Sequence, residues 1–182
     1  MADSTQSSII YLLSSPMNAL LALRSLLFLI LLPGTVAGYI PFRILRGSGQ
    51  LFMPPLSVSA VLAGGVGLAG VCVLLRCVWD FFAAGRGTLA PIDPPRHLVV
   101  RGLYQFTRNP MYNGVLAVLL GEAWFFRSTA LFQYAVLMFV IFHLMVVVYE
   151  EPALESRFGE SYRIYRKAVP RWGFTARAFA GS

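Results

Sequence analysis

Long runs of apolar residues dominate this sequence and most constrain its fold. A helix that crosses a bilayer needs about 20 mostly apolar residues. Four stretches meet or approach that length, and we predict membrane helices over residues 17–40, 56–82, 112–126 and 129–149. Only 13% of the chain is charged, whereas soluble domains carry roughly 25%. We therefore predict an all-α integral membrane bundle of about four helices, with residues 1–182 in a single membrane domain.

Short residue pairs predict how these helices begin, bend and connect. Pro33-Gly34 predicts a kink in the first helix. Asn109-Pro110 predicts the start of the third, because Asn is a good N-cap and Pro is favoured at the first helical position. Only Arg127-Ser128 separates the third helix from the fourth, so we expect a tight helical hairpin there.

The second predicted helix carries small residues and one pair of opposite charges. Gly64, Gly67 and Gly70 recur at spacings of three and four, as does Ala60 before them, and such a face lets another helix approach closely. Arg76 and Asp80 are one turn apart near the helix end, where we expect them to pair. Whether this pair also has a functional role is left open.

Two polar segments, residues 85–110 and 150–182, hold most of the positive charge. The first contains four prolines and cannot be one regular helix. The second has helical periodicity to about Lys167, which predicts an amphipathic helix on the membrane surface. The basic residues of the two segments are Arg86, Arg96, Arg101, Arg108, Arg157, Arg163, Arg166, Lys167, Arg171 and Arg177. The positive-inside rule then places both segments and both termini on the cytoplasmic side.

Several classes of function are disfavoured. The basic residues flank apolar segments, so anionic lipid headgroups are expected contacts and nucleic acid is not. Cys72 and Cys77 point in different directions on a helix, and His97 and His143 are isolated, so neither a disulfide nor a metal site is expected. The polar N-terminus lacks the basic region of a signal peptide, so the first apolar helix is expected to stay in the mature protein.

Candidate chemistry gathers where the two polar segments meet the membrane helices. Glu150 and Glu151 are predicted at the end of the fourth helix, where carboxylates oppose the macrodipole. They are either solvated or paired with arginines, or they form a site for a cation or for ligand hydroxyls. The predicted helix start at Asn109-Pro110 offers backbone N–H groups to an anion. A ligand with a carboxylate and a positive centre, such as S-adenosylmethionine, would suit this arrangement, which permits that ligand without selecting it.

Two blocks, RHLVVRGLYQFTRNPMYNG and YEEPALESRFGESYRIYRKAVPRW, resemble the superfamily of isoprenylcysteine carboxyl methyltransferases and phospholipid methyltransferases. They occur in order, flank the predicted hairpin and lie within residues 85–172, which the resemblance implies is the cofactor-binding half. The resemblance implies a membrane-embedded methyltransferase that binds S-adenosylmethionine on the cytoplasmic side, beside a lipophilic acceptor. The implied cofactor-binding residues are Arg96, His97, Leu98, Val99, Tyr104, Arg108, Asn109, Pro110, Met111, Tyr112 and Glu150.

At two positions the sequence departs from the pattern of the isoprenylcysteine branch. Asn109 replaces the motif histidine, in an N-P-M-Y sequence similar to that of phosphatidylethanolamine methyltransferases. Val146 stands where the isoprenylcysteine branch has an arginine that serves its substrate. An amine acceptor must lose a proton, and Glu151 and Tyr112 are the candidate catalytic residues for that step.

The sequence does not choose among O-, N- and S-methylation, and it predicts no oligomeric state. Two other functions are weighed. One is an NADPH-dependent reductase related to sterol reductases, which are much longer. The other is a non-catalytic polytopic membrane protein with an assembly or binding role, which a lack of cofactor binding would favour.

Overall fold

The computed structural model describes residues 31–84, 98 and 100–179, with the backbone alone for 81–84. Within these ranges every regular element is helical, which confirms the predicted all-α class. The elements are η1 (Thr35–Tyr39), α3 (Ile40–Gly47), α4 (Val58–Ala84), η2 (Gly102–Gln105), α5 (Pro110–Phe125), α6 (Thr129–Met145), η3 (Val146–Glu150), α7 (Glu151–Phe158) and α8 (Glu160–Ala168).

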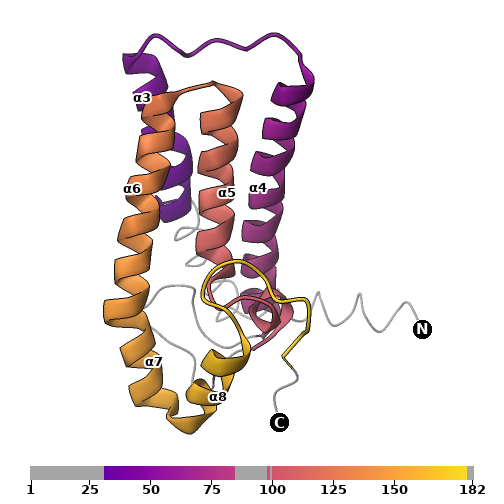
Figure 1. Cartoon of the computed structure of the whole chain (residues 1–182), viewed down its shortest axis with the longest axis vertical. Helices are drawn as coiled ribbons and strands as arrows, with labels where there is room; N and C mark the ends of the chain where they lie inside the picture. The colour runs from indigo at the N-terminus through magenta and orange to yellow at the C-terminus, as the bar shows by residue number, and fades with distance from the viewer. Residues whose placement is uncertain (1–30, 85–97, 99, 180–182) are drawn as a thin grey trace, which may run out of the picture.

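The helices α4, α5 and α6 stand side by side, with α5 between the other two (Figure 1). The turn from α5 to α6 is as tight as predicted: Arg127 adopts a φ of 50° and the Ser128 side chain caps α6 by accepting from the Leu131 amide at 3.4 Å. The π-helical turn η1 also packs against the α5–α6 hairpin. There the Tyr134 hydroxyl of α6 donates to the Val36 carbonyl of η1 at 3.0 Å.

Glycines bring α4 and α5 into backbone contact. A Cβ atom added to Gly70 would lie 2.6 Å from the Gly114 carbonyl oxygen, and one added to Gly121 would lie 2.6 Å from the Gly67 nitrogen. The predicted close approach at Gly67 and Gly70 is therefore confirmed. A Cβ atom added to Gly64 or to Gly67 would meet nothing within 4 Å, but the backbone of Gly67 lies against the Gly121 position, and that of Gly64 is not among the nearest contacts of either α5 glycine. The predicted part of Gly64 in this contact is therefore wrong.

The outward faces of the long helices are apolar. Within the described residues, Val58–Asp80 and Thr129–Phe158 are long and apolar enough to cross a membrane, yet only 22% and 28% of their most apolar windows are buried. A soluble protein rarely exposes so large an apolar surface. With 16 residues, α5 is about 24 Å long, short of the roughly 30 Å hydrocarbon core. Residues 17–30 lie outside the described ranges, so the count of four spans stays a prediction.

The first predicted helix runs further than expected. Residues 31–34 are already helical, and the chain passes through Pro33-Gly34 into the single π-helical turn of η1 and on into α3. The predicted end at residue 40 is wrong, because α3 continues to Gly47 and buries Leu45 against Ala123 of α5 and Leu131 of α6.

The fourth predicted helix is also longer. Its predicted end at residue 149 is wrong: α6, η3 and α7 follow one another to Phe158, and the Glu151 amide donates to the Val146 carbonyl across a π-helical turn. The helix ends only at Gly159, whose φ of 53° favours glycine. The two adjacent glutamates therefore lie inside a helix, and the macrodipole argument does not apply to them.

The predicted C-terminal amphipathic helix is divided at Gly159 into α7 and α8. Tyr162 and Tyr165 form the buried face of α8, as its periodicity predicts. That face packs with Val169 against Leu98 and other apolar residues of the protein. The amphipathic face thus covers the polar end of the bundle, and its apolar side is not left for the membrane surface.

Candidate functional site

The two polar segments come together at one end of the bundle. Residues 170–179, the C-terminal strap, run alongside residues 105–108, and the strap loops across the lower end of α5 in Figure 1. The Arg108 amide donates to the Pro170 carbonyl at 2.9 Å, and the Thr175 amide donates to the Phe106 carbonyl at 2.9 Å. Most of the predicted site residues that the structure describes lie at this end of the bundle, near the paired segments.

Glu151 is the centre of a buried ion-pair network. Its Oε1 accepts from Arg108 Nη1 at 2.9 Å and from Arg171 Nε at 2.6 Å, while its Oε2 accepts from Arg171 Nη2 at 2.9 Å. Only 8% of its side chain is exposed. Hydrogen bonding to Glu151 raises the pKa of Arg171, so the guanidinium stays charged. Three charge-assisted bonds therefore use most of the acceptor capacity of this carboxylate, and its principal partners are the protein's own arginines.

Glu150 has a different environment. The Tyr112 hydroxyl donates to its Oε1, and no arginine pairs with it among the residues that the structure describes. The Tyr112 ring stacks on Phe142 with centroids 4.7 Å apart, which fixes the direction of its hydroxyl. Glu150 is also the last residue of η3, and π-helical turns occur frequently at functional sites.

Tyr104 joins this pair from η2. Burial raises the pKa of its phenol, and the nearby ionisable groups Cys77, Tyr165, Glu150 and Tyr112 act in the same direction. Its carbonyl accepts from the Tyr165 hydroxyl at 2.7 Å, so α8 holds the turn in place. Three predicted residues, Tyr104, Tyr112 and Glu150, therefore lie close together.

Asn109 precedes α5, as predicted, but its side chain does not cap the helix. Its Nδ2 donates instead to the Arg171 carbonyl at 3.1 Å. Beside it, the Nε of Arg108 is buried and has no hydrogen-bond partner among the described residues. The uncapped first turn of α5 and this N–H are donors suited to an anion.

The other predicted residues contribute packing. Leu98 contacts the cluster of Tyr162, Tyr165 and Val169, Pro110 is buried at the start of α5, and Met111 packs against the bundle core. Arg96, His97 and Val99 lie outside the described residues.

Arg171 and Trp172 have site contacts that sequence reasoning missed. The Trp172 Nε1 donates to His143 Nδ1 at 3.1 Å, so this histidine of α6 is not isolated, and the strap is attached to a second helix. The available signal was the short sequence VPRW, which ends the second resembling block directly after an amphipathic pattern.

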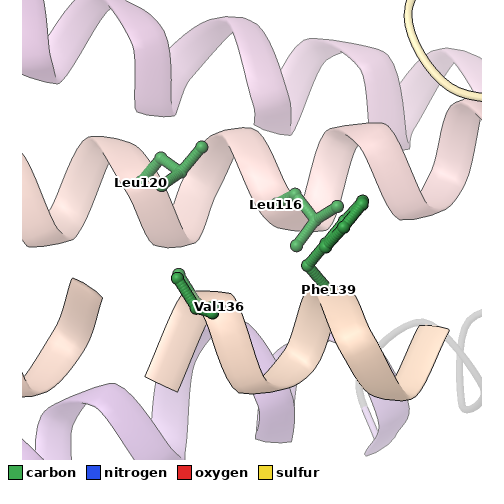
Figure 2. Close-up of a pocket in the computed structure, with 5 residues that line it drawn as sticks. Leu116, Leu120, Val136 and Phe139 are labelled. Carbon is green, nitrogen blue, oxygen red and sulfur yellow. The ribbon is translucent and has the colours of Figure 1, made fainter. Parts of the chain in front are cut away.

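An apolar groove of about 190 Å³ lies between α5 and α6 (Figure 2). Leu116 and Phe139 project toward one another across it, and Leu120 and Val136 flank them further along. Phe139 also contacts Trp172, with ring centroids 5.3 Å apart. The groove therefore extends toward the strap at the polar end of the bundle.

Comparison with known families assigns the sequence to one of them. The family model described as phospholipid methyltransferase matches residues 59–161, more than half of the chain. The chain belongs to the phospholipid methyltransferase family. Family membership and the two long apolar helices make it a membrane protein of the methyltransferase class. The family match includes Tyr104, Tyr112 and both adjacent glutamates, but it ends before the strap. No curated protein and no solved structure matches the chain.

Proposed function

We propose that this protein is an S-adenosylmethionine-dependent methyltransferase that methylates a lipophilic acceptor in the membrane. The observation that carries the proposal is Glu150, a carboxylate with a tyrosine partner and no arginine partner among the described residues. Most other described acids already face arginine: Asp80 pairs with Arg76 at 3.1 Å, as the sequence predicted. Glu122 also lacks such a partner in the described part of the chain, but it lies near the opposite end of α5.

The charge pattern fits both ends of the cofactor. A sulfonium is a positive centre, and Glu150 offers it a negative charge that no described arginine neutralises. A carboxylate needs donors, which the first turn of α5 and the buried Nε of Arg108 supply. Tyr104 and Tyr112 would line the space between them. Arg96, His97 and Val99 stay proposed cofactor-binding residues from the resemblance.

Bound S-adenosylmethionine supplies a methyl group that an acceptor lone pair displaces from sulfur, with the carbon–sulfur electron pair leaving on the sulfur. The protein then needs chiefly to position the two groups and exclude water. An amine acceptor also releases a proton. Tyr112 would take this proton on its oxygen while passing its own to Glu150. Glu151, enclosed by two guanidiniums, then orients its neighbours and is not the base.

A phospholipid amine is the acceptor that best fits. The family name and Asn109 of the N-P-M-Y sequence support it, and the groove between α5 and α6 could hold a hydrocarbon chain beside the site. The basic polar end and both termini would then face the cytoplasm.

The test is methyl transfer in nanodiscs. Wild-type protein in phosphatidylethanolamine nanodiscs, supplied with methyl-labelled S-adenosylmethionine, should label the lipid, and nanodiscs of phosphatidylglycerol should give none. Tyr112→Phe should lower kcat more than it changes KM for the cofactor. Cofactor binding without lipid labelling would refute the phospholipid acceptor, and absent cofactor binding would favour the non-catalytic function.

A further inference from the structure

The C-terminal strap contributes a charged side chain to the centre of the site. Arg171 lies beyond the end of the family match, yet it makes three contacts with predicted site residues. Its guanidinium donates to both oxygens of Glu151, at 2.6 and 2.9 Å, and its carbonyl accepts from Asn109 at 3.1 Å. Among the described residues of the strap, Arg171 alone forms an ion pair with these elements.

These contacts join the two elements that carry Tyr112 and Glu150. Asn109 immediately precedes α5, the helix of Tyr112, and Glu151 immediately follows Glu150 in the chain. Arg171 therefore fixes α5 relative to η3 and α7. The next residue, Trp172, donates to His143 of α6, so that two consecutive strap residues hold two parts of the bundle.

We infer that Arg171 is a positioning residue of the methyl-transfer site, which sets the separation of Tyr112 and Glu150 through Glu151 and Asn109. This inference rests on the proposed function. The forked geometry of arginine satisfies both oxygens of a carboxylate, which a lysine ammonium cannot do in the same way. Arg108 reaches one of these oxygens only, so it cannot replace the second contact.

The test compares cofactor affinity among matched variants of the full-length protein in nanodiscs. Arg171→Gln should weaken S-adenosylmethionine binding about tenfold to a hundredfold, because a displaced Glu150 would lose a charge-assisted contact with the cofactor, which is an effect of that order. Arg171→Lys should recover part of the loss. Arg163→Gln is the matched control, since it removes an arginine that is 54% exposed and pairs with Glu155 away from the site, and it should bind like the wild type.

A double-mutant cycle with Glu151→Gln separates positioning from general damage. If Arg171 acts through Glu151, adding Arg171→Gln to Glu151→Gln should cause little further loss of affinity. Independent, additive losses would overturn the inference, as would unchanged affinity in Arg171→Gln. Circular dichroism and thermal unfolding confirm that each variant is folded.

If Arg171→Gln does not fold, the kinetic constants of Arg171→Lys provide the test. It should raise KM for the cofactor more than it lowers kcat, and unchanged KM would overturn the inference. Failure of the proposed function looks different: the wild type itself would not bind S-adenosylmethionine. Binding by the wild type with normal binding by Arg171→Gln refutes the role of Arg171 alone.

Discussion

Two carboxylates one turn apart on α7 have the same kind of partner and different surroundings. Glu151 and Glu155 each accept hydrogen bonds from two arginines. The side chain of Glu151 is 8% exposed and that of Glu155 is 29% exposed. The partners of Glu155 both come from α8, the next helix, whereas those of Glu151 come from the segment before α5 and from the strap.

This difference shows what each network does. The buried network (Arg108, Glu151 and Arg171) joins three distant segments of the chain, and removing one member leaves charges uncompensated where water is scarce. The surface network (Glu155, Arg163 and Arg166) closes the local turn between α7 and α8, where solvent screens the charges. We therefore expect similar ion pairs to hold the candidate site together in one place and to contribute little to stability in the other.

Breaking the buried network should give the largest effect. Glu151→Gln leaves two guanidiniums facing a neutral amide and should lower the free energy of unfolding by about 3 kcal/mol. Reversible unfolding in detergent micelles, monitored by circular dichroism, measures this value. A loss below about 1 kcal/mol would mean that the network behaves like a surface pair.

Tyr112→Phe sharpens the contrast between adjacent glutamates. It removes the hydrogen-bond donor of Glu150 and leaves a half-buried carboxylate without a partner, which should cost about 1–3 kcal/mol. The same unfolding assay applies. If Tyr112→Phe lowers the free energy of unfolding as much as Glu151→Gln does, the proposed difference between Glu150 and Glu151 would be wrong.

Asn109→Ala tests the attachment of the strap to α5. It removes one neutral hydrogen bond to the Arg171 carbonyl and should cost about 1 kcal/mol. Amide exchange of the strap should become faster, most clearly at Thr175, whose amide donates to the Phe106 carbonyl. Unchanged exchange there would show that the backbone pairing alone retains the strap.

Glu155→Gln should give the smallest effect, because its network is exposed and screened. We expect an unfolding midpoint within experimental error of the wild type at 0.15 M salt. A midpoint shift comparable to that of Glu151→Gln would contradict the comparison.

The sequence predicts those helix starts and turns that depend on a few neighbouring residues. Pro110 predicts the start of α5, and Arg127-Ser128 predicts the hairpin, because caps and turns depend on a few neighbouring residues. Gly67 and Gly70 predict a close helix approach, but their partners Gly114 and Gly121 are known only once the helices are placed.

The remaining features depend on contacts between distant residues. The helix continues past its predicted end because both glutamates that end the apolar run have partners in distant segments. Tyr112 donates to Glu150, and Arg108 and Arg171 pair with Glu151. Tyr112 and Glu150 appear among the candidates from the resemblance, but their direct contact does not follow from it. Arg171 resembles every other arginine of the basic tail until the strap is seen to fold back over α5.

The most direct measurement is calorimetric titration of S-adenosylmethionine into the purified protein, with Glu150→Gln and Glu155→Gln as matched variants. We expect the wild type and Glu155→Gln to bind alike, and folded Glu150→Gln to lose at least about tenfold in affinity, since one charge-assisted contact contributes roughly 1.5–3 kcal/mol. Equal affinity in all three proteins would contradict the assignment of Glu150 to the cofactor.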